Sequence, residues 1–202
     1  MKRIGISLRV ENIQKYNEKR DALSQDWIVF LQKLNLMPVL IPNKIDNIEK
    51  YILELKLDGV ILSGGDNIGD FPDRDETERQ ILEIAKNRSI PILGVCRGMQ
   101  IINNFFGGSH LVKSNKKHVN NDHSINLTKD FQFCKKESIT VNSYHNNVII
   151  TNNLGYELVS FATHDDETVE GIKHSKYPII GVMWHPERNQ DENSVQLLKE
   201  IF

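Results

Sequence analysis

A cysteine between two glycines has the setting in this chain that best suits covalent chemistry. Cys96 stands in Gly94-Val95-Cys96-Arg97-Gly98, after a short apolar run and before a helical pattern. A nucleophile on so tight a strand-to-helix turn projects above its sheet, and flanking glycines leave room for the crowded backbone. The first turn of the helix offers free N–H groups and partial positive charge, which favour a thiolate and can bind an oxyanion. The segment predicts a cysteine nucleophile; a buried structural cysteine is the alternative.

A cysteine nucleophile requires a base, and the sequence offers one further along the chain. His185 and Glu187 are separated only by Pro186 and follow the apolar run 179–183. Proline fixes the local backbone, so the imidazole and the carboxylate can face one pocket, where the carboxylate holds the tautomer of the imidazole. We therefore expect Cys96, His185 and Glu187 to act together as nucleophile, base and orienting acid.

The elements that must position these residues alternate between short apolar runs and helical patterns. In the first half of the chain the predicted strands are residues 4–8, 37–41, 59–62 and 90–95. The predicted helices are residues 21–34, 46–56 with Asp46 as N-cap, 75–87 and 99–106. Four successive strand–helix units predict a parallel, doubly wound sheet, and the continuously apolar strands indicate that both of its faces are buried.

After Gly107 and Gly108 the pattern changes to short alternating segments. Residues 124–127 and 138–141 are predicted to be antiparallel strands at the edge of the sheet. Further strands are expected over 157–162, 169–172 and 179–183, and a final helix over 192–202. We therefore expect an α/β fold in one domain spanning residues 1–202: a doubly wound, mostly parallel sheet flanked by helices and carrying antiparallel edge strands. Ligands bind beyond the carboxyl ends of the strands in such sheets, where Cys96 would lie.

Composition excludes several classes of protein. The 202 residues are 39% hydrophobic and 26% charged, which is ordinary for a globular protein and excludes intrinsic disorder as the main state. The 25 basic and 27 acidic residues leave a net charge of −2, so we expect no nucleic-acid and no membrane-surface partner. No apolar run approaches the ~18 residues of a membrane span, and no targeting pattern is visible at the start of the sequence. Two cysteines are too few for a disulfide framework. We expect a cytoplasmic protein.

The motifs together resemble the class I glutamine amidotransferase superfamily and, more narrowly, its γ-glutamyl hydrolase branch, typified by γ-glutamyl-γ-aminobutyrate hydrolase. The resemblance begins with Gly-Val-Cys-Arg-Gly-Met-Gln around Cys96 and Gly-Val-Met-Trp-His-Pro-Glu around His185. Further motifs follow in the family's order along almost the whole chain: Leu62-Ser63-Gly64-Gly65-Asp66, Arg74-Asp75 with Glu78, Gly107-Gly108, Val141-Asn142-Ser143-Tyr144-His145, and Asp166 with Val169-Glu170. The resemblance implies the flavodoxin-like fold of this superfamily.

The resemblance also implies roles for individual residues. Cys96 would attack the γ-carbonyl of a glutamyl group and form a thioester, while His185 would move the protons and Glu187 would orient it. The backbone N–H groups of Gly65 and Arg97 would form the oxyanion hole. Substrate contacts are implied for Gly64, Gln100, Ser143, Tyr144 and His145. An ordinary polar helix residue remains the alternative for Gln100, and a hydrogen-bonded structural histidine the alternative for His145.

The sequence departs from the branch where the rim of the pocket is expected. His145 is followed by Asn146 and Asn147 where the branch usually has His-His-Gln, and Asp166-Glu167 replaces the usual Asp-Gly. These departures argue against the branch's usual small amine as the leaving group.

As a compact member of the branch, the chain also resembles the hydrolases that act on γ-glutamyl-CDP-amidate in capsule phosphoramidate biosynthesis. This nucleotide-linked conjugate is the first specific substrate that we expect, although no motif for a cytidine or a diphosphate is visible. The alternatives are a γ-glutamyl-γ-aminobutyrate-type conjugate, or glutamine hydrolysed by a glutaminase subunit that delivers ammonia to a synthase partner. Phosphate contacts could come from Lys113, Lys116, Lys117, Arg97 and Arg74. A solvated loop is the alternative for the three lysines.

We expect neither a cofactor nor a metal. His110, His118, His123, His145 and His164 show neither the two-histidine spacing of a helical metal site nor a convincing carboxylate companion. Ser143 with His145 is a weaker nucleophile–base pair than Cys96 with His185, because no strand-to-helix turn presents the serine. Cys134 is interpreted as an incidental thiol.

Overall fold

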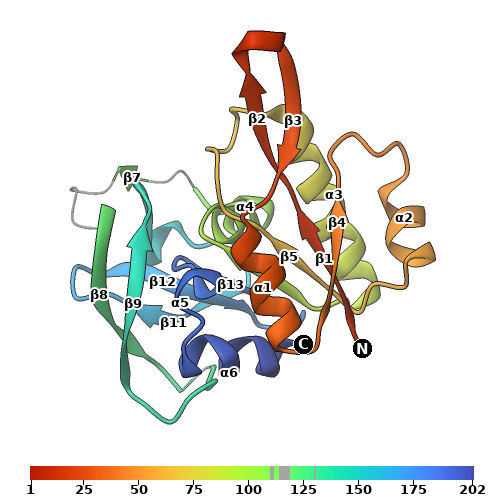
Figure 1. Ribbon diagram of the computed structural model, residues 1–202. Coiled ribbons are helices and arrows are strands. Elements are labelled where there is room, and N and C mark those ends of the chain that lie inside the picture. Colours follow the sequence, from red (N-terminus) through yellow and green to blue (C-terminus); the bar gives the residue numbers. More distant parts are fainter. Residues whose placement is uncertain (110–111, 114–118, 130) are drawn as a thin grey trace.

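A mixed sheet of eleven strands forms the centre of the computed structural model, which describes residues 1–109, 112–113, 119–129 and 131–202 (Figure 1). Its strand order is β4-β1-β5-β6-β13-β12-β11-β8-β9. The parallel half comprises β4 (Met37–Ile41), β1 (Arg3–Ser7), β5 (Gly59–Leu62), β6 (Ile92–Val95) and β13 (Ile179–Val182). The antiparallel half comprises β12 (Thr168–His174), β11 (Leu158–Thr163), β8 (Val119–Leu127) and β9 (Ser138–Tyr144). The expected mostly parallel sheet with antiparallel edge strands is confirmed.

Two short strands lie off this path. They are β10 (Asn147–Ile150), which pairs with β12, and β7 (Val112–Lys113), which pairs with β10. A 3₁₀ turn, η2 (Thr151–Asn153), follows β10.

Helices cover both faces of the sheet. Successive strand residues point to opposite sides, and the apolar residues on each side are buried against helices. The helices are α1 (Gln25–Lys33), α2 (Ile48–Glu54), α3 (Pro72–Arg88), α4 (Arg97–Phe105), α5 (Pro186–Asn189) and α6 (Glu192–Ile201). On one face, Ile61 and Leu93 belong to an apolar cluster with residues of α1 and α6. On the other face, Val60 and Ile92 belong to a cluster with residues of α2, α3 and α4. The sheet is therefore doubly wound, as predicted.

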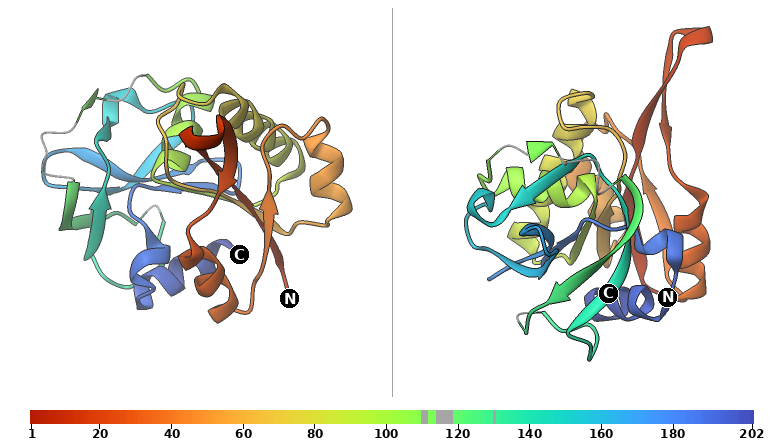
Figure 2. Two further views of the ribbon diagram at one scale, coloured as in Figure 1. Left: turned by 45° about the horizontal axis from the view of Figure 1, so that its top comes forward. Right: turned by 90° about the vertical axis from the view of Figure 1, so that its left-hand side faces the viewer.

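A hairpin that the sequence analysis did not predict follows β1. Its parts are β2 (Arg9–Ile13), the 3₁₀ turn η1 (Gln14–Tyr16) and β3 (Glu18–Ala22). The helix expected over residues 21–34 consequently starts later, where Ser24 caps α1 by accepting a hydrogen bond from the backbone N–H of Asp26 at 3.4 Å. The hairpin rises from the end of the sheet at which β1 terminates, which is the carboxyl end of the parallel strands (Figure 2).

The starts of three other helices also differ from the prediction. The cap of α2 is Asn47 rather than Asp46, because the Asn47 side chain accepts a hydrogen bond from Lys50 N at 2.8 Å. Helix α3 starts earlier than residue 75, with Pro72 in its first turn, where a missing N–H is no loss. Helix α4 starts at Arg97 rather than 99, so its first turn directly follows Cys96. In the part of the chain that the structure describes, no helix has the length and apolarity that a membrane span requires.

Candidate active site

Cys96 occupies a strained backbone position between β6 and α4. Its φ of 52° and ψ of −105° are unusual for a residue with a side chain, at a cost of about 1–3 kcal/mol. Two glycines permit the turn: a Cβ on Gly98 would lie 2.0 Å from the carbonyl oxygen of Leu62, and one on Gly94 would lie 2.5 Å from the carbonyl carbon of Gly98. The start of α4 therefore packs directly on the strands, and the thiol lies at the carboxyl end of the sheet, as the sequence predicts.

The structure brings His185 and Glu187 to this thiol. His185 and Cys96 both pack against Gly64, and the imidazole acts on the thiol, while its Nδ1 lies 2.8 Å from Glu187 Oε1. Asn142 on β9 fixes the backbone of His185 from both sides: its Oδ1 accepts from His185 N, and its Nδ2 donates to His185 O, each at 2.8 Å. A Cβ on Gly64 would lie 2.8 Å from His185 Cε1, so the imidazole lies directly against the loop after β5.

The charges of this pair follow from its contacts. Burial raises the pKa of the Cys96 thiol, but the hydrogen bond and charge of His185, the charge of His145 and the backbone N–H of Arg97 outweigh burial and lower it. Burial lowers the pKa of His185, but its hydrogen bonds to Cys96 and Glu187 and their charges outweigh burial and raise this pKa to about 9. The lowered pKa of the thiol and the raised pKa of the imidazole both favour a thiolate facing an imidazolium, which suits a nucleophile beside a general acid.

A second buried histidine, His145, faces the site from the loop after β9. Its Nδ1 lies 3.0 Å from the carbonyl oxygen of Asn147, and its Nε2 lies 3.6 Å from Glu170 Oε2. Because the carbonyl can only accept, Nδ1 carries a proton, and the carboxylate favours a second proton on Nε2. Burial opposes this charge, but the hydrogen bond and charge of Glu170 outweigh burial and raise the pKa of His145. His145, once protonated, adds a second positive charge that lowers the pKa of the Cys96 thiol.

Glu170 on β12 anchors this second charge together with His123 on β8. His123 Nε2 lies 3.5 Å from Glu170 Oε2, and the His123 ring stacks on His164 with centroids 4.5 Å apart. Burial raises the pKa of Glu170, but hydrogen bonds to His123 and His145 outweigh burial and lower it to about 2. The sequence analysis found no convincing carboxylate companion for His123 and His145, and this expectation is wrong, because Glu170 lies beside both.

The donor atoms of His123, His145 and Glu170 lie within 4.8 Å of one another, so this cluster could also hold a metal ion. His110 and His118 lie outside the described residues.

Beneath the loop after β5 lies a buried network of charges. Glu78 on α3 accepts from Ser7 Oγ at 2.7 Å and from Arg74 Nε at 3.1 Å, and it also pairs with Arg97. The Arg74 Nη2 donates to the carbonyl oxygens of Ser63 and Gly64, at 2.7 and 3.0 Å. Breaking such a buried pair leaves an uncompensated charge, so the network holds the loop and the start of α4 in fixed positions.

Because of this network, the expectation that Arg74 and Arg97 contact a substrate phosphate is wrong. The side chains of Arg74 and Arg97 are 0% and 1% exposed: Glu78 pairs with both, Asp66 pairs with Arg74, and Asp75 pairs with Arg97. Guanidinium groups so deeply buried are out of reach of a substrate phosphate. Of the three lysines, Lys116 and Lys117 lie outside the described residues, as does the side chain of Lys113.

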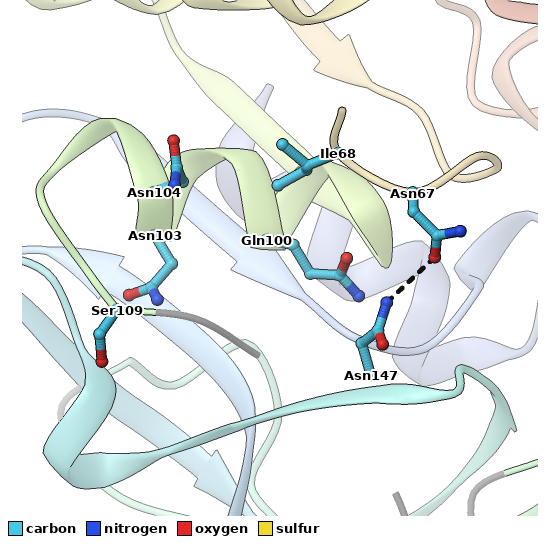
Figure 3. A pocket seen from close by; sticks show the side chains of 7 residues that line it. All are labelled: Asn67, Ile68, Gln100, Asn103, Asn104, Ser109 and Asn147. Carbon is cyan, nitrogen blue, oxygen red and sulfur yellow. Dashed lines mark hydrogen bonds between the residues drawn. The ribbon is translucent and has the colours of Figure 1, made fainter. Parts of the chain in front are cut away.

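The predicted substrate contacts come from α4 and from β9 with the loop after it. Gln100, one turn of α4 beyond Cys96, is buried and lines a pocket of about 240 Å³ (Figure 3). Asn67 and Asn147 close one end of this pocket through a 3.1 Å hydrogen bond. Ser143 is buried on β9, whereas Tyr144 is 41% exposed and has its ring centroid 5.9 Å from that of His185.

The sequence analysis did not single out four residues of this site. Asn142 and Glu170 stand within the motifs that carried the resemblance, but no role was assigned to either. Arg9 and Arg188 line a second pocket beside His185, and no pattern around them indicates this. Gly65, with a φ of 114°, lines the same pocket, and its assignment to the oxyanion hole remains a prediction.

Comparisons with known proteins agree with this geometry. Residues 3–187 match the Peptidase C26 family. A Campylobacter jejuni protein named gamma-glutamyl-CDP-amidate hydrolase is 35% identical over 209 residues, covering 98% of this chain and 96% of that protein. A subunit of the glutamine-hydrolysing GMP synthase of Methanococcus aeolicus is 31% identical over 172 residues, covering 85% of this chain and 86% of that protein.

Solved structures show the same architecture. A Thermoplasma acidophilum protein provisionally assigned as a GMP synthase subunit superimposes with a TM-score of 0.78 at 25% identity, covering 100% of this chain and 92% of its own. A Thermotoga maritima glutamine amidotransferase has a TM-score of 0.68 at 17% identity, covering 98% and 83%, and it shows the fold alone. The chain therefore belongs to the Peptidase C26 family, among the class I glutamine amidotransferase-like hydrolases. The resemblance stated from the sequence is confirmed.

The pKa of His185 sets an alkaline limit for turnover. An imidazolium is needed to protonate a leaving amine, so kcat should fall as the pH rises through about 9, where His185 loses its proton. Glu187→Gln removes the carboxylate that stabilises this charge and should move the alkaline limb to lower pH, as measured by pH–rate profiles. Glu192→Gln, an exposed change on α6, should leave the limb in place. An unchanged limb in Glu187→Gln would contradict the pairing.

The His145–Glu170 pair makes a separate prediction about the thiol. Glu170→Gln removes the anion that keeps His145 charged, so the pKa of Cys96 should rise and its alkylation by iodoacetamide should need higher pH. The experiment uses a Cys134→Ser background, so that only Cys96 reacts. The control is Glu157→Gln, which removes a carboxylate 3.9 Å from His174 elsewhere in the fold. If both variants alkylate with the wild-type pH dependence, His145 does not act on the thiolate.

Proposed function

We propose that this protein hydrolyses a γ-glutamyl amide through a glutamyl thioester on Cys96 and releases glutamate. The observation that carries the proposal is the hydrogen-bonded pair His185–Glu187 beside Cys96, which stands at a strained strand-to-helix turn. This arrangement supplies the nucleophile, the proton carrier and the orienting acid that acyl transfer requires.

In the first half of the reaction the thiolate of Cys96 attacks the γ-carbonyl carbon. The oxygen takes the negative charge and is held by the N–H groups of Arg97 and Gly65. His185 then gives its Nε2 proton to the leaving nitrogen, the C–N bond breaks, and the thioester remains. Gln100 and the 143–145 segment hold the glutamyl group, with Gly64 beneath it.

The second half of the reaction returns the protein to its starting state. His185, now neutral, takes a proton from a water molecule, whose oxygen attacks the thioester carbon. The C–S bond breaks, glutamate leaves, and the thiolate faces an imidazolium again. His145 shares in stabilising the thiolate as it forms, because its charge is fixed by Glu170.

The specific substrate that we propose is γ-glutamyl-CDP-amidate, with water as the second reactant and glutamate and cytidine diphosphoramidate as products. The support is the 35% identity to the Campylobacter jejuni hydrolase over 98% of this chain. This reaction would belong to capsule phosphoramidate biosynthesis. Cys96 and Cys134 are both free thiols, which supports a reducing compartment such as the cytoplasm.

A glutaminase subunit that passes ammonia to a synthase partner is the second candidate. The 31% identity to the Methanococcus aeolicus GMP synthase subunit favours it, because that protein is one subunit of a glutamine-hydrolysing enzyme. The two candidates share the Cys96 chemistry and differ in whether a partner is needed for turnover.

The test is glutamate release by the purified chain from γ-glutamyl-CDP-amidate, γ-glutamyl-γ-aminobutyrate and glutamine. We expect release from γ-glutamyl-CDP-amidate without a partner, and a loss of about 10³-fold or more in Cys96→Ala and in His185→Ala. Glu187→Ala should lose less, because orientation rather than bond making is affected. A parallel assay in EDTA tests the His123–His145–Glu170 cluster: undiminished turnover shows that no metal is required. No release from any substrate without an added synthase would favour the glutaminase subunit.

A further inference from the structure

A narrow pocket of about 50 Å³ opens beside His185 and shares no lining residue with the Gln100 pocket. Its lining includes Arg9, Gly65, His185, Glu187 and Arg188. In the proposed reaction His185 protonates the leaving nitrogen, so the leaving group must depart along this imidazole. The pocket therefore lies where the leaving group is bound, and its small volume makes a larger group extend past the rim.

Two arginines stand at this pocket with donors that the fold does not use. The Nε of Arg9, on β2, is buried and has no hydrogen-bond partner among the described residues, while its Nη2 lies 2.7 Å from Glu11 Oε1. The exposed guanidinium of Arg188, on α5, lies 4.0 Å from the centre of the Tyr144 ring and forms no ion pair with a described carboxylate. Glu187 lines the same pocket, but its charge is balanced by the His185 imidazolium.

Most arginines whose ion pairs are described have their charge matched elsewhere in the fold. Arg20, Arg79 and Arg88 each pair with a carboxylate within 2.9 Å at the surface. Arg74 and Arg97 are enclosed by acids in the interior. Arg9 pairs with Glu11 through Nη2 only, so its Nε and the guanidinium of Arg188 are the donors left at the pocket beside His185.

Arg9 is held in place by the same network that holds the loop after β5. Asp66 Oδ2 accepts from the backbone N–H of Val10 at 3.2 Å and from Arg74 Nη1 at 2.9 Å. A Cβ on Gly65 would lie 3.2 Å from the Cβ of Arg9, so the arginine stem lies directly against the proposed oxyanion loop. The base of the Arg9 side chain is thus fixed at the pocket before a ligand binds.

We propose that Arg9 and Arg188 bind a phosphoryl group attached directly to the leaving nitrogen, and so select phosphoramidate conjugates. The inference rests on the proposed function and names the residues that recognise its leaving group. A guanidinium matches the oxygens of a phosphoryl group with two parallel hydrogen bonds. A phosphorus bonded to the leaving nitrogen places its oxygens beside His185, within the narrow pocket. The carboxylate of a longer amine would lie several bonds further out.

The test compares kcat and KM of the wild type, Arg9→Gln and Arg188→Gln. The substrates are γ-glutamyl-CDP-amidate, γ-glutamyl-γ-aminobutyrate, whose leaving group carries a distant carboxylate, and glutamine, whose leaving group carries no anion. For γ-glutamyl-CDP-amidate each variant should raise KM about tenfold or more, because a charged hydrogen bond is lost. The ratio of its kcat/KM to that of glutamine should fall by a similar factor. Arg20→Gln, on the same hairpin but paired with Glu18, should change neither quantity.

The proposal would be overturned if the ratio of kcat/KM for γ-glutamyl-CDP-amidate to kcat/KM for glutamine were the same in the wild type and both arginine variants. A loss of kcat/KM confined to γ-glutamyl-γ-aminobutyrate would also overturn it. A second measurement needs no turnover: calorimetric binding of CDP to the wild type and to the same variants. We expect CDP to bind more weakly to both arginine variants and to bind Arg20→Gln as it binds the wild type. CDP binding that is absent from all four proteins, or equal in all four, would also overturn the proposal. Failure of the proposed function would show differently, as no glutamate release from any substrate by the wild type.

Discussion

The strained backbone of Cys96 is the constraint on which the rest of this site depends. A residue with a side chain holds a φ of 52° and a ψ of −105° only where its surroundings leave no alternative. Here α4 starts against the carbonyl oxygen of Leu62, and any side chain on Gly98 would collide with it. This close contact between the start of α4 and Leu62 fixes where the thiol lies and which N–H groups surround it. It therefore also fixes where a carbonyl carbon must be placed to react.

Buried charges hold the partners of this thiol around it. Glu78 neutralises Arg74 and Arg97 under the loop after β5, while Glu187 and Glu170 favour the protonated forms of His185 and His145 on the thiol side. Each carboxylate is expensive to bury alone and acceptable when paired, so each fixes the position of its cationic partner. The result is a polar site whose dipoles are set before substrate binds, which is the condition for stabilising a developing oxyanion.

The sequence alone predicted those strands and candidate site residues for which the hydrophobic pattern and the local chemistry agree. The strand 59–62 was predicted with the bounds that the structure has, and Cys96, His185 and Glu187 were predicted from a tight turn and a proline-spaced pair. The hairpin after β1 was missed because residues 18–22 are almost all polar and carry no strand pattern of their own. They are held by pairing across the hairpin.

Contacts between distant segments could not be predicted from the sequence. Glu170 meets His123 and His145 only because β12, β8 and the loop after β9 converge in the antiparallel half of the sheet. The pairing of Arg74 and Arg97 with Glu78 likewise appears only once α3 packs beside α4, and it turns two expected phosphate contacts into internal supports. Sequence spacing shows which groups are available, whereas packing decides which of them stay open to a ligand.

The most direct test of the account is to look for the glutamyl thioester itself. Wild-type protein is mixed with γ-glutamyl-CDP-amidate, quenched in acid within the first turnovers, digested and analysed by mass spectrometry. We expect one glutamyl group on the peptide that contains Cys96, removable by hydroxylamine and absent in Cys96→Ala. Glutamate release that persists in Cys96→Ala, with no adduct on any cysteine of the wild type, would contradict the account and place the attack on a water molecule instead.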